Sequence, residues 1–291
     1  MPNPNATDDD DEDIDETIDE EEEEVDLSIL PDDLNERPDW LLYMGRNQNT
    51  YLSPIDISIG RTETLLLNPL KWVNYDTEPR KIKLSNTGYT VILCANWHVN
   101  VKRPHLRSGP FSDTYIFSQL HFHWGQNAME GSEHSIDGMK YPIEMHAIHY
   151  NEKYGSQEEA SLHSLDGLCI VVYFFQQANT HVIIKNYSLL NLIEPFENDY
   201  LLYWGSLVAN RKTYPLMWII CRQPKPVTME QIHYFREILD ANGEKLLQNF
   251  HTIQLVNENG DEIIDDRRIF HINPMSEISS TDDTTYYYRS T

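Results

Sequence analysis

The sequence predicts a mainly β fold (α+β) in which one domain is built on a large antiparallel or mixed sheet. Short apolar stretches recur between Pro, Gly and Asn from Trp40 onward, and signals for helix starts are few. The 291 residues contain no internal repeat and no second region with its own pattern. Many strands with few helices are typical of a dominant sheet with minor helices around it.

The first 33 residues differ from the rest in charge. They carry 17 of the 47 Asp and Glu residues of the chain and no Lys or Arg. Like charges repel along such a segment, and few apolar groups are present to offset the entropy of ordering. We therefore expect a disordered acidic tail over residues 1–38, which serves solubility or docks on a basic protein partner. The remaining 30 acidic and 22 basic residues argue against nucleic acid as a partner, because phosphate binding needs a basic surface.

A single domain is expected over residues 39–272. Strands are expected at 81–84, 89–93, 99–102, 115–124, 143–150, 168–175, 181–184 and 216–221. Capping signals at Ser156 and Thr228 predict two short helices, the second of which carries an apolar stripe and stops at Gly243. The polar segment 273–291 is expected to add little to the core.

Composition also bears on the compartment. No apolar run approaches the length of a membrane span, and the first residues lack the basic start and apolar stretch of a signal peptide. Three cysteines, an odd number, lie in apolar strand-like contexts: Cys94, Cys169 and Cys221. We expect a reduced, cytoplasmic monomer that does not contact membranes.

The stretch 119–149 carries the candidate chemistry. Alternate side chains of a strand point to the same face, so Gln119, His121 and His123 share one face, and Glu144 and His146 share a face of a second strand. Two neighbouring strands can thus place three imidazoles around one metal ion with an open fourth position, as in catalytic zinc sites. Gln119 and Glu144 lie where a hydrogen-bond partner of a ligating imidazole belongs.

Other interpretations of these histidines stay open. A histidine on an apolar strand is often a core residue with its hydrogen bonds satisfied, and a structural β domain without metal would contain such residues. A cupin-type site also uses His-x-His, but there a carboxylate follows shortly after, and residues 124–129 contain none.

Several motifs, taken together, resemble the α-class carbonic anhydrases. They occur in one order between Trp40 and Ile272: Ser53-Pro54-Ile55-Asp56-Ile57, Gln119-x-His121-x-His123-Trp124-Gly125, Gly131-Ser132-Glu133-His134, Glu144-x-His146-x-x-His149, Gly205-Ser206-Leu207 followed by Trp218, and Asn249. The resemblance implies a central twisted, mostly antiparallel sheet of about ten strands with a few short peripheral helices.

The resemblance also implies a function, the reversible hydration of CO2 to bicarbonate and a proton. It assigns Zn²⁺ to His121, His123 and His146, and it makes His134 and His149 buried histidines that bind no metal. Bound zinc lowers the pKa of water to about 7. The remaining implied roles are hydrogen-bond partners of the ligands (Gln119, Glu144, Asn249), a catalytic carboxylate (Glu133) and an apolar pocket for CO2 (Ile148, Ile170, Leu207, Trp218).

Three departures from the family pattern bear on activity. Val208 stands where the family has a Thr whose hydroxyl bonds to Glu133, so that Glu133 is either protonated or paired elsewhere. A hydrogen bond to a charged group contributes about 1.5–3 kcal/mol, and its loss slows the reaction roughly ten- to two-hundredfold. Residues 209–211 lack the prolines of the family loop. Tyr89 stands at the position of the proton-shuttle His, and a phenol transfers protons poorly at neutral pH because its usual pKa is about 10.

Two functions from different classes follow. The retained ligands and their partners favour a zinc-dependent carbonate dehydratase with reduced activity. The acidic tail, Val208 and Tyr89 favour a non-catalytic carbonic anhydrase-related binding protein that keeps the fold, with or without the zinc.

Overall fold

The structure is a computed structural model that describes residues 52–163, 166–178, 188–209, 212–253 and 267–275. All of them belong to one compact unit, residues 33–291. The expected acidic tail, the expected strand 181–184 and loop residues 210–211 lie outside the described residues.

The described residues form short helices and many strands. The strands are β1 (Asp56–Ile57), β2 (Glu63–Leu65), β3 (Leu70–Val73), β4 (Lys81–Asn86), β5 (Val91–Asn96), β6 (His105–Ser108), β7 (Phe111–Trp124), β8 (Ser135–Ile136), β9 (Ile143–Asn151), β10 (Leu168–Gln177), β11 (Tyr200–Ala209), β12 (Lys212–Cys221), β13 (Lys225–Val227) and β14 (Phe270–Ile272). The helices are α2 (Gln157–Ala160) and α3 (Met229–Arg236), with 3-10 turns η3 (Ile59–Arg61), η4 (Glu152–Tyr154) and η5 (Leu189–Asn191).

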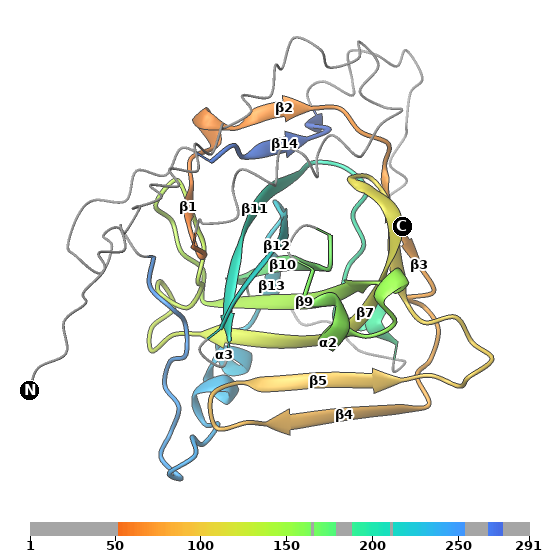
Figure 1. Ribbon diagram of the computed structural model, residues 1–291. Helices are drawn as coiled ribbons and strands as arrows, with labels where there is room; N and C mark the ends of the chain where they lie inside the picture. Colours follow the sequence, from red (N-terminus) through yellow and green to blue (C-terminus); the bar gives the residue numbers. More distant parts are fainter. Residues whose placement is uncertain (1–51, 164–165, 179–187, 210–211, 254–266, 276–291) are drawn as a thin grey trace, which may run out of the picture. The chain divides into compact units, whose positions relative to one another are not determined.

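One mixed sheet of 12 strands dominates the fold. Its main order is β2-β14-β11-β12-β10-β9-β7-β5-β4, so that β4 and β2 form its two edges (Figure 1). Strand β13 pairs with β10, β6 joins β3 to β7, and β1 pairs with β8 in a separate two-stranded sheet. Most pairings in the large sheet are antiparallel, and β12, β13 and β2 each make one parallel pairing. The predicted mainly β architecture is confirmed, with twelve strands in place of about ten.

One predicted strand does not form. In place of the strand expected at 99–102, residues 98–101 form a turn closed by the bond from Val101 N to His98 O at 2.9 Å, because the exposed Val99 has no core to face. The family motif Gly205–Leu207 lies inside the long strand β11. A strand interior normally disfavours Gly. Here a Cβ on Gly205 would lie 2.2 Å from Ser53 Oγ, so the close approach of Ser53 requires glycine.

The helix starts follow the capping signals. The side chain of Ser156 accepts a bond from the amide of Glu159, and Thr228 forms a complete capping box with Gln231. Helix α3 ends at Arg236, however, well before the predicted stop at Gly243. The residues after it still contribute to the core, because Ile238 packs on the second hydrophobic cluster. None of the described helices is long and apolar enough to cross a membrane.

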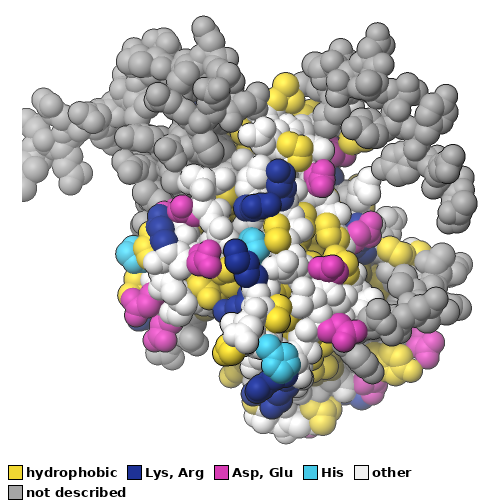
Figure 2. All heavy atoms as spheres, turned by 90° about the vertical axis from the view of Figure 1, so that its right-hand side faces the viewer, with side chains coloured by type: hydrophobic (Ala, Val, Ile, Leu, Met, Phe, Trp, Pro, Cys, Tyr) yellow, Lys and Arg dark blue, Asp and Glu magenta, His cyan; other side chains and the backbone are white. Residues whose placement is uncertain are grey.

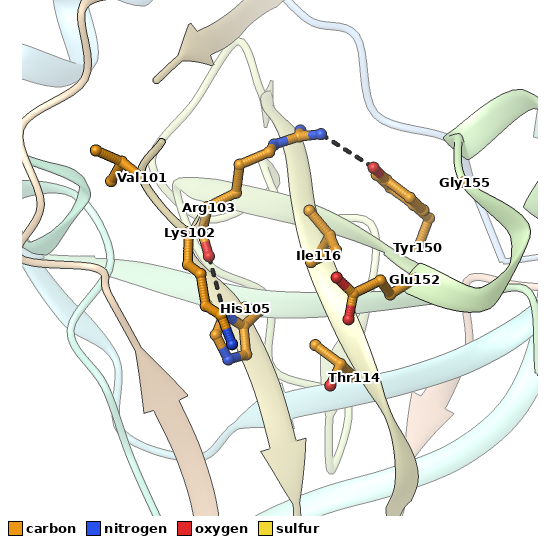
Figure 3. Close-up of a pocket in the computed structure, with 9 residues that line it drawn as sticks. All are labelled: Val101, Lys102, Arg103, His105, Thr114, Ile116, Tyr150, Glu152 and Gly155. Carbon is orange, nitrogen blue, oxygen red and sulfur yellow. Dashed lines mark hydrogen bonds between the residues drawn. The ribbon is translucent and has the colours of Figure 1, made fainter. Parts of the chain in front are cut away.

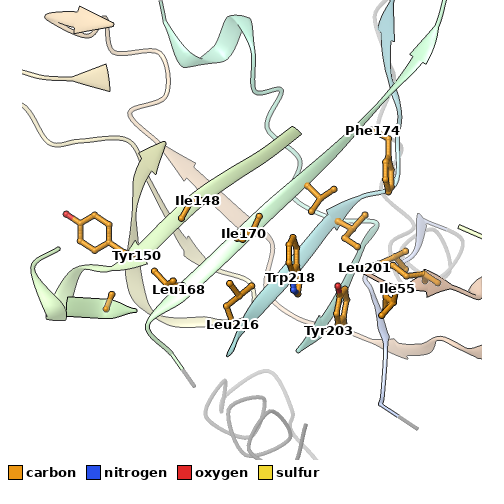
Figure 4. Packing of buried hydrophobic residues seen from close by; sticks show 14 of the residues in the cluster. Ile55, Ile148, Tyr150, Leu168, Ile170, Phe174, Leu201, Tyr203, Leu216 and Trp218 are labelled. Atoms are coloured by element: carbon orange, nitrogen blue, oxygen red, sulfur yellow. The ribbon is translucent and has the colours of Figure 1, made fainter. Parts of the chain in front are cut away.

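The main hydrophobic cluster packs against the candidate site, because its member Trp218 contacts the His146 ring. Ile148, Ile170, Trp218 and Tyr203 are successive cross-strand partners on β9, β10, β12 and β11 (Figure 4). The rings of Trp218 and Tyr203 stack with an interplanar angle of 10°. Every residue of β9 is buried, so its polar side chains need partners inside the protein.

Candidate metal centre

The pairing of β7 with β9 brings three imidazoles together. His121 lies directly opposite His146 in the antiparallel register, and His123 lies two residues further along β7 on the same face. The ring centroids are 5.0 Å apart for His121 and His146, 4.6 Å for His123 and His146, and 5.1 Å for His121 and His123. One nitrogen from each ring lies within 4.8 Å of the other two.

Hydrogen bonds determine which ring nitrogens are available. His146 donates from Nε2 to Glu144 Oε1 at 2.6 Å, which leaves the lone pair on Nδ1. His123 donates from Nδ1 to the carbonyl of Asn249 at 3.3 Å, which leaves the lone pair on Nε2. His146 Nδ1 and His123 Nε2 are both buried and have no hydrogen-bond partner. Buried polar atoms are normally paired, so two unpaired lone pairs in one imidazole cluster fit a bound cation.

His134 and His149 behave differently. His134 donates from Nδ1 to Glu144 at 2.6 Å, and its Nε2 is hydrogen-bonded to the Tyr203 hydroxyl at 2.7 Å. His149 donates from Nδ1 to the carbonyl of Ala147 and is hydrogen-bonded through Nε2 to Tyr75. Each of these two rings therefore has a hydrogen-bond partner at both nitrogens, unlike His123 and His146.

The carboxylate of Glu144 is completely buried and holds two of these rings. Besides His134 Nδ1 and His146 Nε2, it accepts the backbone amide of His134 at 2.8 Å. Burial raises the pKa of this carboxyl, but the neighbouring His134 and the hydrogen bonds from both rings outweigh burial and hold the pKa well below its usual range. Glu144 is therefore an anion that fixes the tautomer of His146.

Two of these imidazoles, His121 and His123, have lowered pKa values and stay neutral. Burial lowers the pKa of His123 to about 4, against the opposing effect of Glu133. Desolvation, followed by the neighbouring His146 and His123 rings, lowers the pKa of His121 well below 6.5. Neutral imidazole is the form that binds metal, so His121 and His123 are in their ligating state at neutral pH.

A cavity of about 990 Å³ leads to these rings. His121, His123, Gln119, Asn249 and His251 form its polar side. Its apolar side includes Ile148, Leu168, Leu207, Val208, Tyr214 and Leu246. The cavity lining is therefore mixed, with apolar side chains contributing the larger share, and the rings of His121 and His123 form part of it.

A second cavity, of about 340 Å³, lies beside β6 and β7 (Figure 3). Its Arg103 side chain donates to the Tyr150 hydroxyl and the Phe117 carbonyl, and His105 is bonded to the Arg103 carbonyl. These partners hold the cationic side chain in place as part of the fold. On the face seen in Figure 2, Lys and Arg side chains are interspersed with Asp and Glu, so this face offers no surface of a single charge.

The sequence as a whole matches the family model of eukaryotic-type carbonic anhydrases over residues 35–186 and 176–260. The chain belongs to the carbonic anhydrase family. It is 28% identical to putative carbonic anhydrase 5 of Caenorhabditis elegans, over 77% of this chain and 78% of that protein. It is 32% identical to carbonic anhydrase 1 of Monodelphis domestica (73% and 92%) and 31% identical to carbonic anhydrase 1 of Oryctolagus cuniculus (68% and 91%).

Within this carbonic anhydrase fold, the four residues expected to form the substrate pocket occupy two layers. Ile148 and Leu207 line the cavity. Ile170 and Trp218 lie behind it in the hydrophobic cluster, where Trp218 contacts the His146 ring with centroids 5.1 Å apart. Trp218 thus packs against the ring of the candidate ligand His146.

Three further positions of the carbonic anhydrase pattern line the cavity. Asn249 accepts the Trp124 amide at its side-chain oxygen and donates to the carbonyls of Tyr89 and Phe122, which ties β7 to the turn that carries Tyr89. Tyr89 is 75% exposed and lines the cavity. The expected hydrogen bond from Gln119 to His121 is absent from the described residues, and Gln119 lines the cavity wall.

Glu133 has a partner that sequence reasoning missed. Its Oε1 accepts the backbone amide of His251 at 2.9 Å and the His251 ring Nδ1–H at 2.5 Å. Burial raises the pKa of Glu133, but the neighbouring His123, the hydrogen bond from His251 and the neighbouring His146 outweigh burial and lower the pKa to about 2. This carboxyl is therefore ionised, and it pairs with His251. His251 stands two residues after Asn249 in the closing segment, and that spacing was the available signal.

Proposed function

We propose that this carbonic anhydrase family member binds Zn²⁺ and catalyses the reversible hydration of CO2 with reduced activity. One observation carries the proposal. Two buried imidazole lone pairs, on His123 Nε2 and His146 Nδ1, have no hydrogen-bond partner in a cluster of three rings at a cavity wall. A site built for histidines alone would satisfy these atoms.

The chain's own residues supply binding and orientation. His121, His123 and His146 are the proposed ligands, and Glu144 and the Asn249 carbonyl fix the tautomers of His146 and His123. Zinc in such a site lowers the pKa of water to about 7. Ile148 and Leu207 offer an apolar wall suited to CO2, which has no net dipole.

Val208 is the reason to propose reduced activity. Its side chain is 51% exposed in the cavity wall and carries no hydroxyl. It therefore neither donates to Glu133 nor accepts from a group in the cavity. The missing hydrogen bond corresponds to a roughly ten- to two-hundredfold slower reaction.

The surroundings of the domain belong to the same proposal. We place the domain at residues 39–272, between an acidic tail over 1–38 and a polar segment over 273–291, in a cytoplasmic monomer. The boundary at 273 borders the packed core, because Asn273 is buried and bonds to both the amide and the carbonyl of Leu67. The tail serves solubility or a basic protein partner.

The second candidate is a non-catalytic binding protein of the same family. The combination of Val208 and Tyr89, which both line the cavity, favours it. The Val208 side chain cannot form a hydrogen bond, and the Tyr89 phenol transfers protons poorly at neutral pH. In that case the cluster of three imidazoles supports the fold, with or without bound zinc, and takes no part in catalysis.

Two measurements on the full-length chain decide between these functions. Elemental analysis should give about one zinc per chain, and stopped-flow CO2 hydration should exceed the uncatalysed rate. Zinc far below one per chain would rule out both zinc-dependent interpretations. One zinc with no hydration above background, in wild type and in Val208→Thr, would favour the binding protein.

A further inference from the structure

The contact between Glu133 and His251 joins segments that are 118 residues apart. Glu133 lies in the turn before β8 and is almost fully buried, and its Oε1 receives both hydrogen bonds from His251. The side chain of His251 is 71% exposed and lines the same cavity as His121 and His123. The pair therefore connects the cavity surface to a buried carboxylate.

The same carboxylate atom lies beside a proposed ligand. Glu133 Oε1 is 3.1 Å from His123 Nδ1, and the rings of His123 and His251 have centroids 6.2 Å apart. An acceptor near Nδ1 favours the tautomer with the proton on Nδ1 and the lone pair on Nε2. The Asn249 carbonyl, at 3.3 Å, is the other acceptor for this proton.

A buried carboxylate needs donors to keep it in one place, because an unpaired charge in the interior is costly. No hydroxyl is available from Val208. The backbone amide of His251 supplies one donor, and the ring of His251 supplies the second, charge-assisted one. No other hydrogen bond to the Glu133 side chain is found among the described residues.

We propose that His251 is a positioning residue of the metal centre, whose ring holds the Glu133 carboxylate against His123 and so presents His123 Nε2 to the metal. This inference rests on the proposed zinc site and extends it to a residue outside the family motifs. His251 acts through Glu133 and touches no reacting atom.

The hydrogen bond between the His251 ring and Glu133 is tested first, in the metal-free full-length protein. Long-range ¹H–¹⁵N NMR of the histidine rings should show His251 protonated on Nδ1 and His123 in its Nδ1–H tautomer. In Glu133→Gln the Nδ1–H signal of His251 should move, and a share of His123 should change to the other tautomer. Unchanged ring signals for both residues in Glu133→Gln would overturn the inference, whatever the protein does with zinc.

Zinc affinity, measured by competition with a chromophoric chelator, tests the consequence. His251→Ala should weaken zinc binding about tenfold, since partners of metal ligands contribute roughly ten- to one hundredfold and one backbone donor remains. His251→Gln, which keeps an N–H donor, should restore most of this affinity. Equal affinity in wild type and His251→Ala would contradict the proposal, as would a Gln variant no better than Ala.

The chain offers a matched control. His233 lies on α3, and Glu237 is the residue that follows α3. They form an exposed pair with 3.4 Å between His233 Nε2 and Glu237 Oε1. His233→Ala removes an imidazole from a carboxylate that belongs neither to the cluster nor to the cavity lining, and should leave zinc affinity and the His123 tautomer unchanged. If wild type itself binds no zinc, the proposed function fails, while the NMR result still decides whether His251 positions Glu133.

Discussion

His121 and His146 are direct cross-strand partners on β7 and β9, and their ring centroids are 5.0 Å apart. Side chains directly opposite each other in an antiparallel pair lie on the same face. The register of a single strand pair therefore determines whether a cluster of three imidazoles exists, since a shift by one residue would turn one set of rings to the other face.

The first prediction concerns this cluster. His146→Ala should lower zinc affinity by more than about 100-fold, because it removes a proposed ligand and not merely a partner of one. Isothermal titration of the apo protein with zinc measures the change. His98→Ala, at a histidine outside the cluster, is the control and should bind as wild type. Tight stoichiometric binding by His146→Ala would place the metal elsewhere.

The second prediction concerns Val208. Val208→Thr should accelerate CO2 hydration at least several-fold and at most roughly two-hundredfold, because a hydroxyl restores a hydrogen bond at the site. Stopped-flow hydration measures kcat/KM. Val208→Ala shortens the side chain without adding a hydroxyl and should not accelerate the reaction. Equal gains in the Thr and Ala variants would mean that space, and not the hydroxyl, limits the rate.

The third prediction concerns proton transfer. Tyr89→His places an imidazole, with a usual pKa of about 6.5, on the exposed turn at the cavity. In weak buffer kcat should rise, while concentrated imidazole buffer should bring wild type to the same kcat by carrying the proton itself. A gain that persists unchanged in concentrated buffer would point to a cause other than proton transfer.

The fourth prediction concerns the turn that carries Glu133. A Cβ on Gly131 would lie 1.7 Å from the carbonyl oxygen of Pro142, so Gly131→Ala must displace backbone. The variant should be destabilised by at least about 1–3 kcal/mol in urea unfolding. Gly60→Ala, where no atom lies within 4 Å of the added Cβ, should change stability by less than about 0.5 kcal/mol. Similar values for both variants would contradict this packing.

The fifth prediction concerns pH. Burial lowers the pKa of His149 to about 3, more than its bond to Ala147 raises it. The unfolded state takes up a proton near pH 6.5 and the folded state does not, so this contribution to stability is complete above pH 6.5 and is lost as the pH falls toward 3. The loss is about 1.4 kcal/mol per pH unit.

Urea unfolding between pH 7 and pH 5 measures the total slope, to which His121 and His123 add because their pKa values are also lowered. The NMR signal of the His149 ring isolates the contribution of His149. The signal should stay that of a neutral imidazole throughout this range. A His149 ring that titrates near pH 6.5 would show that its bonds to Tyr75 and Ala147 do not exclude the charged form.

The sequence by itself determined features that depend on near neighbours. The two-residue period of a strand placed Gln119, His121 and His123 along one cavity wall, and the capping residues Ser156 and Thr228 started the two helices. These outcomes follow from backbone geometry over a few residues, which the order of side chains encodes directly.

Only the tertiary structure decided which distant segments meet. Three features depend on contacts between segments far apart in the chain: the pairing of Glu133 with His251, the packing of Trp218 on His146 and the inclusion of Gly205 in β11. Such contacts are set by the packing and register of the whole sheet, and no local period carries them. The loss of a hydroxyl at Val208 was therefore visible in the sequence, whereas the residue that pairs with Glu133 in its absence was visible only in the fold.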